Sequence, residues 1–408
     1  MPKRGRHGGT VGTPRIPIGV IFSSTGFYRT IGEEMLNGAL LAIEEINESA
    51  DFDFAFEPKI ENPGGDLNQY RILCEDLLRN RAVRHIVGCY TSSSRKEVIP
   101  AFEKHDALLW YPSHYEGFES CNNVIYTGAA PNQHIVPLIE YVLQAFGDRV
   151  YCIGSNYIWA WENNRIMREI VQACLGSVVA EKYLPVGSTD VQHFINEIED
   201  TKPNFIFNTL IGESSYAFLR SYHGSGRGRT ADHPREIPVT SCTLSEPELL
   251  SIGSEAAGGH IACSVYFQSL ERPENRAFVS RFKARFGQDK VTSADAEASY
   301  IAIILLAQAI RQAQSTEIEQ IKQAVYACKF DAPHGPVRID PENNHSYLTP
   351  SLGRSTAVGG FEIIRSAEQP VKPDPYLVRF DSQRFFEGLR AGAKPADGSH
   401  RPNLKVVK

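Results

Sequence analysis

The feature of this sequence that most restricts its fold is a regular alternation of short apolar runs with longer amphipathic segments. The apolar runs have the length of buried strands, and the segments between them show helical periodicity over about 10–15 residues. Each helix that joins two parallel strands packs against the sheet, so such a sheet is covered on both faces. The sequence therefore predicts an α/β fold with parallel sheets.

The predicted strands are the runs IPIGVIFS, FAFEPKI, RHIVGCY, ALLWYP, RVYCIGS, FIFNTLIG, IPVTSCT and HIACSVYF. The predicted helices cover 32–48, 68–80, 95–105, 132–146, 162–174, 190–200, 213–223 and 274–286, with two more within 295–328 and a β-rich segment at 336–380.

The strands fall into two groups, at about 15–125 and 128–265. A chain of 408 residues exceeds the ~250–300 residues at which a single core stops growing, so two lobes are expected. No linker or low-complexity tract separates the groups, which indicates lobes coupled by several crossing segments. The basic, Gly-rich residues 1–14 are expected to form a disordered tail, and residues 383–408 a flexible one.

Composition excludes several classes of partner. A net charge of −6 gives no electrostatic basis for binding nucleic acid, and no apolar run reaches the ~18 residues of a membrane span. The N-terminal segment lacks the apolar stretch of a secretory signal. The eight cysteines show no metal-ligand spacing, so free thiols and no metal site are expected. These features predict a cytoplasmic protein, or a periplasmic one if a signal peptide has been removed.

Hydroxyl and aromatic residues gather where predicted strands end. Ligands of open α/β sheets bind outside the carboxyl ends of the strands, so these residues are expected to face a crevice. Each hydroxyl taken alone is also typical of a helix N-cap. Together with the aromatic residues they indicate a site for a small polar ligand. The main groups are Thr91–Ser94, Tyr111–Tyr115, Ser155–Trp159, Asn208–Glu213 and Ser241–Ser245.

Catalytic motifs are incomplete. Ser93–Lys96 matches S-x-x-K, but the S-D-N and K-T-G motifs that accompany it in serine acyl transferases are missing. No nucleophile elbow, phosphate-binding loop or zinc-protease motif occurs either. We therefore expect a protein that is not an enzyme and needs no cofactor.

Several longer stretches occur in order through residues 37–376, among them NGALLAIEEIN, GCYTSSSRKEVIP, YPSHYEGFES, NVIYTGAAPNQ, VYCIGSNYIW, FDAPHGPVRIDPENNHS and PVKPDPY. The chain resembles the amide- and urea-binding branch of the type I periplasmic-binding-protein superfamily. That branch includes cytoplasmic amide sensors and the urea receptors of ABC transporters.

The resemblance implies two Rossmann-like lobes that are joined by three crossovers and close on a ligand. The crossovers would fall near 126–131, 265–270 and 330–336. The first lobe would then comprise 15–127 plus 268–332, and the second 128–267 plus 333–382.

The resemblance also implies the ligand-binding residues. His114 stands where the pattern has a proline, and Trp159 where it has a second tyrosine. The imidazole adds a polar group to the pocket wall, and the indole removes a hydroxyl and takes more volume. The implied residues are Tyr90, Ser92, Tyr111, Ser113, His114, Tyr157, Trp159, Ile211 and Thr243.

Hydroxyls and backbone groups can satisfy a neutral amide, whereas an amino acid needs an acidic partner for its ammonium group. Glu213 is the candidate for that partner, although a carboxylate is also favoured in the first turn of a helix.

The expected function is a non-catalytic sensor of a small amide or urea that acts on a regulatory protein of the antiterminator kind. The alternatives are an ABC-transporter receptor for urea, short-chain amides or branched-chain amino acids, with a permease as partner, and an amide-processing enzyme. A homo-oligomer is compatible with the sensor and with the receptor.

Overall fold

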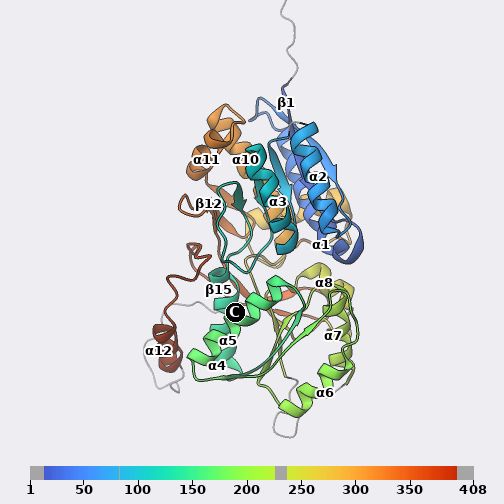
Figure 1. The fold of residues 1–408 in the computed structure, drawn as a ribbon, viewed down its shortest axis with the longest axis vertical. Helices are drawn as coiled ribbons and strands as arrows, with labels where there is room; N and C mark the ends of the chain where they lie inside the picture. The colour runs from blue at the N-terminus through green and yellow to red at the C-terminus, as the bar shows by residue number, and fades with distance from the viewer. Residues whose placement is uncertain (1–12, 82, 226–236, 393–408) are drawn as a thin grey trace, which may run out of the picture.

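The computed structural model describes residues 13–81, 83–225 and 237–392, which form two α/β lobes stacked along the long axis of the molecule (Figure 1). Each lobe is built on a sheet whose strands are joined through helices. The predicted fold class, two α/β lobes with parallel sheets, is confirmed.

The first lobe has a five-stranded parallel sheet in the order β2-β1-β3-β4-β5. Its strands are β1 (Arg15–Ile21), β2 (Ala55–Glu61), β3 (His85–Gly88), β4 (Leu108–Tyr111) and β5 (Val124–Tyr126). Its helices are η1 (Gly26–Tyr28), α1 (Arg29–Glu48), α2 (Leu67–Asn80), α3 (Ser92–His105), α9 (Pro273–Phe286), α10 (Ala294–Ala313) and α11 (Ile318–Ala327).

The second lobe has a seven-stranded sheet in the order β15-β14-β10-β9-β8-β6-β7. The strands β6 (Arg149–Ser155), β7 (Ser177–Leu184), β8 (Phe205–Thr209), β9 (Val239–Ser241) and β10 (Ile261–Ser264) are parallel, and β14 (Ser351–Ser355) and β15 (Phe361–Ser366) join antiparallel. The helices are η2 (Pro131–Gln133), α4 (Ile135–Ala145), α5 (Ile158–Ala173), α6 (Gln192–Thr201), α7 (Glu213–Ser225), α8 (Glu246–Ile252) and α12 (Ser382–Gly392).

Three connections join the lobes, and the third lies further along the chain than expected. The first two follow β5 and β10, near the predicted 126–131 and 265–270. The third falls between β13 (Ser346–Tyr347) and β14, not at 330–336. Strands β11 (Phe330–Ala332) and β12 (Gly335–Ile339) form a small sheet with β13.

The reason for this shift is the apolar face of β12. Val337 and Ile339 alternate with exposed residues and point into the core of the first lobe, where Leu348 joins them. Residues 333–348 therefore pack with the first lobe and not with the second.

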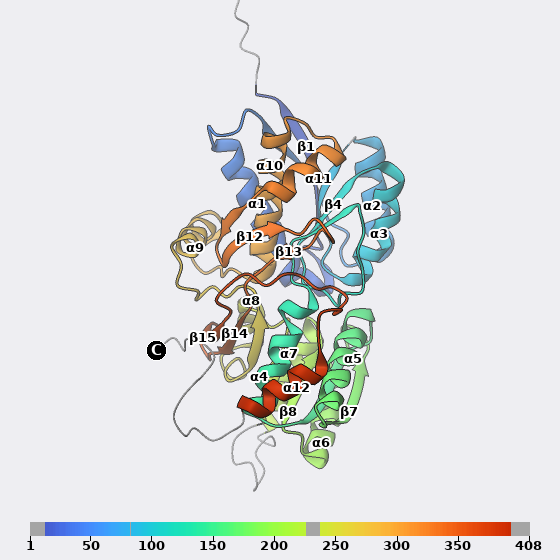
Figure 2. The same ribbon diagram turned by 90° about the vertical axis from the view of Figure 1, so that its left-hand side faces the viewer.

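The C-terminal segment also differs from the expected tail. Residues 382–392 form α12, which lies beside α4 and α5 in Figure 2. Its Phe385, Phe386 and Leu389 pack against the core of the second lobe, because their spacing places them on one helix face. The expected tails at 1–12 and 393–408 lie outside the described residues.

Two further properties follow from the side chains. All eight cysteines are free thiols, and seven of them are buried. None of the helices in the described ranges has the length and apolar content that a membrane span requires.

Helices α1 and α10 of the first lobe approach each other closely at Gly38. A Cβ atom built on Gly38 of α1 would lie 2.0 Å from the carbonyl oxygen of Ala296 in α10. The contact involves backbone on the α10 side, so no side-chain movement can relieve it. Gly38 thus fixes the position at which the first turn of α10 meets α1.

Gly38→Ala should therefore lower the free energy of unfolding by at least about 1–3 kcal/mol, measured by guanidinium chloride denaturation. Gly224→Ala is the matched control, because Gly224 is an exposed residue of α7 with nothing within 4 Å of its added Cβ. That change should be neutral or stabilise the protein by up to ~1 kcal/mol. Equal stability of the Gly38 variant and the wild type would contradict the proposed contact.

Candidate functional site

The hydroxyl-rich turn between β3 and α3 starts with a helix cap. Thr91 is the N-cap of α3, and its Oγ1 accepts a hydrogen bond from the Ser94 N–H at 3.1 Å. The Ser94 hydroxyl donates to the Thr91 carbonyl at 2.8 Å. Both hydroxyls thus stabilise the start of the helix, as Ser and Thr do in many proteins.

Ser92 belongs to a buried ionic network within the first lobe. Its hydroxyl donates to the carboxylate of Glu116, which lies 3.3 Å from the guanidinium of Arg95. Arg95 is fully buried and also pairs with Glu119 at 2.7 Å. Burial would raise the pKa of Glu119, but the adjacent guanidinium outweighs it and the pKa falls to about 2. The role of Ser92 as a ligand residue stays a prediction.

Of the other first-lobe candidates, Tyr111 contacts this network, because its ring lies 4.7 Å from the guanidinium of Arg95. The Tyr111 hydroxyl donates to the Tyr90 carbonyl at 2.8 Å, and the Ser113 hydroxyl donates to the His114 carbonyl at 3.3 Å. The Tyr90 ring meets the Tyr28 ring edge-on at 5.8 Å. The hydroxyls of Tyr111 and Ser113 are therefore already paired with the backbone, and both residues are buried.

Trp159 lies where the two lobes meet. Its ring is perpendicular to the His114 ring of the first lobe at 5.7 Å and stacks near Tyr157 at 6.3 Å. Trp159 forms a cluster with Ile211, and Tyr28 of the first lobe packs against this cluster. The Trp159 indole N–H is buried without a hydrogen-bond partner. Four of the predicted residues are thus brought together from both lobes, namely His114, Tyr157, Trp159 and Ile211.

Two other candidate residues, Thr243 and Glu213, are not fully buried. The Thr243 hydroxyl is 3.0 Å from the Ser241 hydroxyl and is only partly buried. Glu213 has 58% of its side chain exposed and pairs with Arg220 at 3.7 Å on α7. Its position in the first turn of that helix matches the helix-dipole interpretation, and it does not supply a buried acid for an ammonium group.

Two buried acids reach the space between the lobes, from helices α10 and α8. Asp295 of α10 is buried, and burial raises its pKa to about 7. Glu248 lies on α8, at the end of the second lobe that faces the first (Figure 1). The pKa of Glu248 is raised to about 8, mainly by burial and secondly by the charge of Asp295. Burial and then the charges of both acids also raise the pKa of Tyr90.

A small cavity of about 20 Å³ lies beside Asp295. His114 and His134 also line it, and the Nδ1 atom of His134 is buried without a hydrogen-bond partner. Burial lowers the pKa of His114 to about 3, so its 3.8 Å approach to Asp295 is not an ion pair. The cavity is lined from both lobes, by Pro112, His114, Gly128, Ala129, His134, Cys242, Cys263, Ser264, Val265, Ala294, Asp295 and Ala298.

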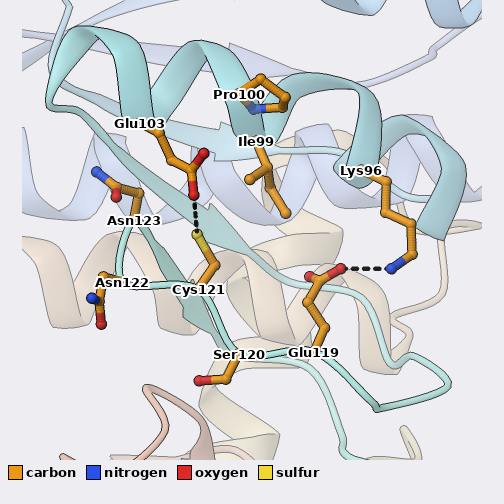
Figure 3. Close-up of a pocket in the computed structure, with 9 residues that line it drawn as sticks. All are labelled: Lys96, Ile99, Pro100, Glu103, Glu119, Ser120, Cys121, Asn122 and Asn123. Carbon is orange, nitrogen blue, oxygen red and sulfur yellow. Dashed lines mark hydrogen bonds and ion pairs between the residues drawn. The ribbon is translucent and has the colours of Figure 1, made fainter.

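A larger pocket of about 520 Å³ lies on the surface of the first lobe, between α3 and the segment 119–123 (Figure 3). Its charged side chains already have partners, since Lys96 pairs with Glu119 at 2.8 Å and the Cys121 thiol donates to Glu103 at 3.8 Å. None of the predicted ligand residues lines this pocket. We therefore place the candidate site at the cavity between the lobes. Within the described ranges no three His, Cys, Asp or Glu side chains are arranged to hold a metal ion.

Two α/β lobes with three connections and a small cavity lined from both lobes define the class of two-lobed binding proteins. The model of the periplasmic binding protein domain matches residues 16–382, so the chain belongs to this family. The amide- and urea-binding branch within it stays a prediction.

Curated relatives include a Leu/Ile/Val-binding protein homolog of Brucella abortus, which is 20% identical over 81% of this chain and 85% of its own length. A limonene hydroxylase of Geobacillus stearothermophilus is 38% identical over 127 residues, which is 31% of this chain. The match spans only 23% of that relative.

Solved structures show the same fold. An ABC-transporter solute-binding protein of R. palustris in complex with benzoate has a TM-score of 0.79 and 17% identity, covering 88% of this chain and 98% of that one. The branched-chain amino acid transporter substrate-binding protein of Streptococcus pneumoniae in complex with isoleucine has a TM-score of 0.75 and 18% identity. It covers 88% of this chain and 100% of its own.

Ser92→Ala should lower the free energy of unfolding by about 1–3 kcal/mol, because the buried carboxylate of Glu116 loses a donor. Ser93→Ala, at the partly exposed neighbouring position, should change it by less than ~0.5 kcal/mol. Guanidinium chloride is the suitable denaturant, since urea is a candidate ligand. If the two variants are equally stable, the hydroxyl of Ser92 does not support the ionic network.

Proposed function

We propose that this chain is the solute-binding component of an ABC-type transport system, and that its ligand is urea or a small neutral amide. The fold supports a receptor, because its structural neighbours include ABC-transporter solute-binding proteins. The observation that carries the choice of ligand is the cavity beside Asp295, which takes only a small group and has a buried acid in its wall.

The charges around the cavity argue against an anionic ligand. The described residues that line it include no lysine or arginine. The buried guanidinium of Arg95 in the first lobe is already paired with Glu116 and Glu119. A carboxylate ligand such as benzoate would have to lie beside Asp295 without a compensating cation, which is unfavourable in a buried site. A neutral ligand with N–H groups avoids this cost.

A ligand sensor that acts on a regulatory protein is the second candidate. Its support is the set of eight free cysteines, which suits a reducing compartment. Fractionation of cells that make the native protein separates the two functions. A receptor for a permease is expected outside the cytoplasmic membrane, and a sensor of this kind in the cytoplasm.

Isothermal titration should detect binding of urea, acetamide or propionamide with one site per chain. Benzoate should not bind under the same conditions, because its carboxylate would face Asp295. Binding of benzoate or leucine, with no response to urea or any amide, would overturn the proposed ligand class.

Ligand saturation should change the fluorescence of Trp159, because its indole lies at the lobe interface with an unpartnered N–H. The change should be lost in Trp159→Phe. It should persist in Trp161→Phe, the matched control, because Trp161 is 45% exposed. A full change of fluorescence in the Trp159 variant would show that this residue does not respond to the ligand.

A further inference from the structure

The first turn of α10 places an acidic residue, Asp295, between the two lobes. Ser293 caps this helix through a hydrogen bond from the Ala296 N–H at 3.2 Å, and Asp295 follows two residues later. An acid in a first turn is normally an exposed group that benefits from the helix dipole. Here Asp295 is only 4% exposed and lines the interlobe cavity, so its position is not explained by helix stability alone.

The carboxylate of Asp295 is short of donors. None of the hydrogen bonds between described residues reaches its side-chain oxygens, and its nearest basic group is Nδ1 of His114 at 3.8 Å. Because burial lowers the pKa of His114 to about 3, that ring brings no positive charge. Leaving a buried carboxylate without donors is costly, and N–H groups of a bound molecule would remove that cost.

His134 provides an independent second acceptor in the same cavity. Its side chain is buried, and its Nε2 lies 2.9 Å from the carbonyl oxygen of Tyr115. A carbonyl only accepts, so Nε2 carries the proton, and burial lowers the pKa of His134 to about 4 and keeps the ring neutral. Nδ1 is then a bare lone pair, and it has no partner. Two unpartnered acceptors therefore belong to residues that line one small cavity.

We propose that Asp295 and His134 accept the N–H groups of the bound solute and thereby select urea and primary amide head groups over carboxylates. The inference rests on the proposed function and adds the residues that set its specificity. Urea presents two NH₂ groups and a primary amide one, whereas a carboxylate presents none. The cavity of about 20 Å³ accommodates a group of roughly the size of one water molecule, which suits an NH₂.

The proposal predicts that the affinity for the ligand depends on pH. The groups that face Asp295 are His114 and His134 from the segments around the first crossover, Tyr90 from the turn after β3, and Glu248 from α8. N–H donors favour the ionised carboxylate, so ligand binding lowers the pKa of Asp295 from its value of about 7. Affinity for urea should therefore rise as the pH increases through about 7 and level off above it.

The central test compares Asp295→Asn with wild type by isothermal titration of urea and acetamide. The asparagine has nearly the same shape but replaces one acceptor oxygen with an NH₂ that opposes the ligand's own. We expect at least about a 10-fold loss of affinity. Glu34→Gln is the matched control, because Glu34 is also a buried acid of the first lobe with a pKa raised to about 7, and it does not line the cavity. Its affinity should equal that of wild type.

The outcomes separate the two proposals. If wild type binds neither urea nor any amide, the proposed function fails. If wild type binds them and Asp295→Asn binds equally well, the function stands and the role of Asp295 is overturned. Should Asp295→Asn fail to fold, the wild-type pH series from about 5.5 to about 8.5 decides, because pH-independent affinity would overturn the role in the same way.

Discussion

The architecture of the site depends on the backbone contact between α1 and α10. Helices this close require a residue without a side chain, and Gly38 meets the Ala296 carbonyl directly. The same turn of α10 carries Asp295, so the packing that holds the first lobe together also sets where the acid enters the cavity. Core packing and ligand selection are thus coupled in one helix.

The buried Arg95 has a complementary role in the first lobe. Its guanidinium ties α3 to the loop that carries Glu116 and Glu119, and it lies over the rings of Tyr111 and Tyr115 at 4.7 and 4.5 Å. An arginine that is paired with two carboxylates is not available to bind an anionic ligand. The network therefore holds this part of the first lobe together without leaving a free positive charge.

The sequence was sufficient to predict the lobes and many strand ends, because parallel buried strands leave strong apolar runs. It did not reveal β7, an edge strand whose residues are half-exposed and include Glu181 and Lys182, so it lacks such a run. The third connection was misplaced because alternation in β12 shows that a face is buried, but not against which lobe. The clustering of His114 with Trp159 followed from strand-end positions. The role of Asp295 could not be predicted in this way, because Asp295 reaches the cavity from the start of a helix and its neighbours are distant in sequence.

Selection between ligands of similar size depends on which hydrogen-bonding groups the protein leaves without partners. On the first-lobe side, Tyr111 and Ser113 have already used their hydroxyl protons on backbone carbonyls, which limits what they can donate to a ligand. Among the described residues where the lobes meet, Nδ1 of His134 and the indole N–H of Trp159 are buried without partners. The side-chain oxygens of Asp295 receive no hydrogen bond from any described residue, and His114 is the basic group beside them, at 3.8 Å. A carbonyl flanked by NH₂ groups is the simplest molecule that offers one acceptor and several donors. A carboxylate offers only acceptors and would leave both His134 and Asp295 unsatisfied, so the cleft discriminates against it by desolvation as well as by charge.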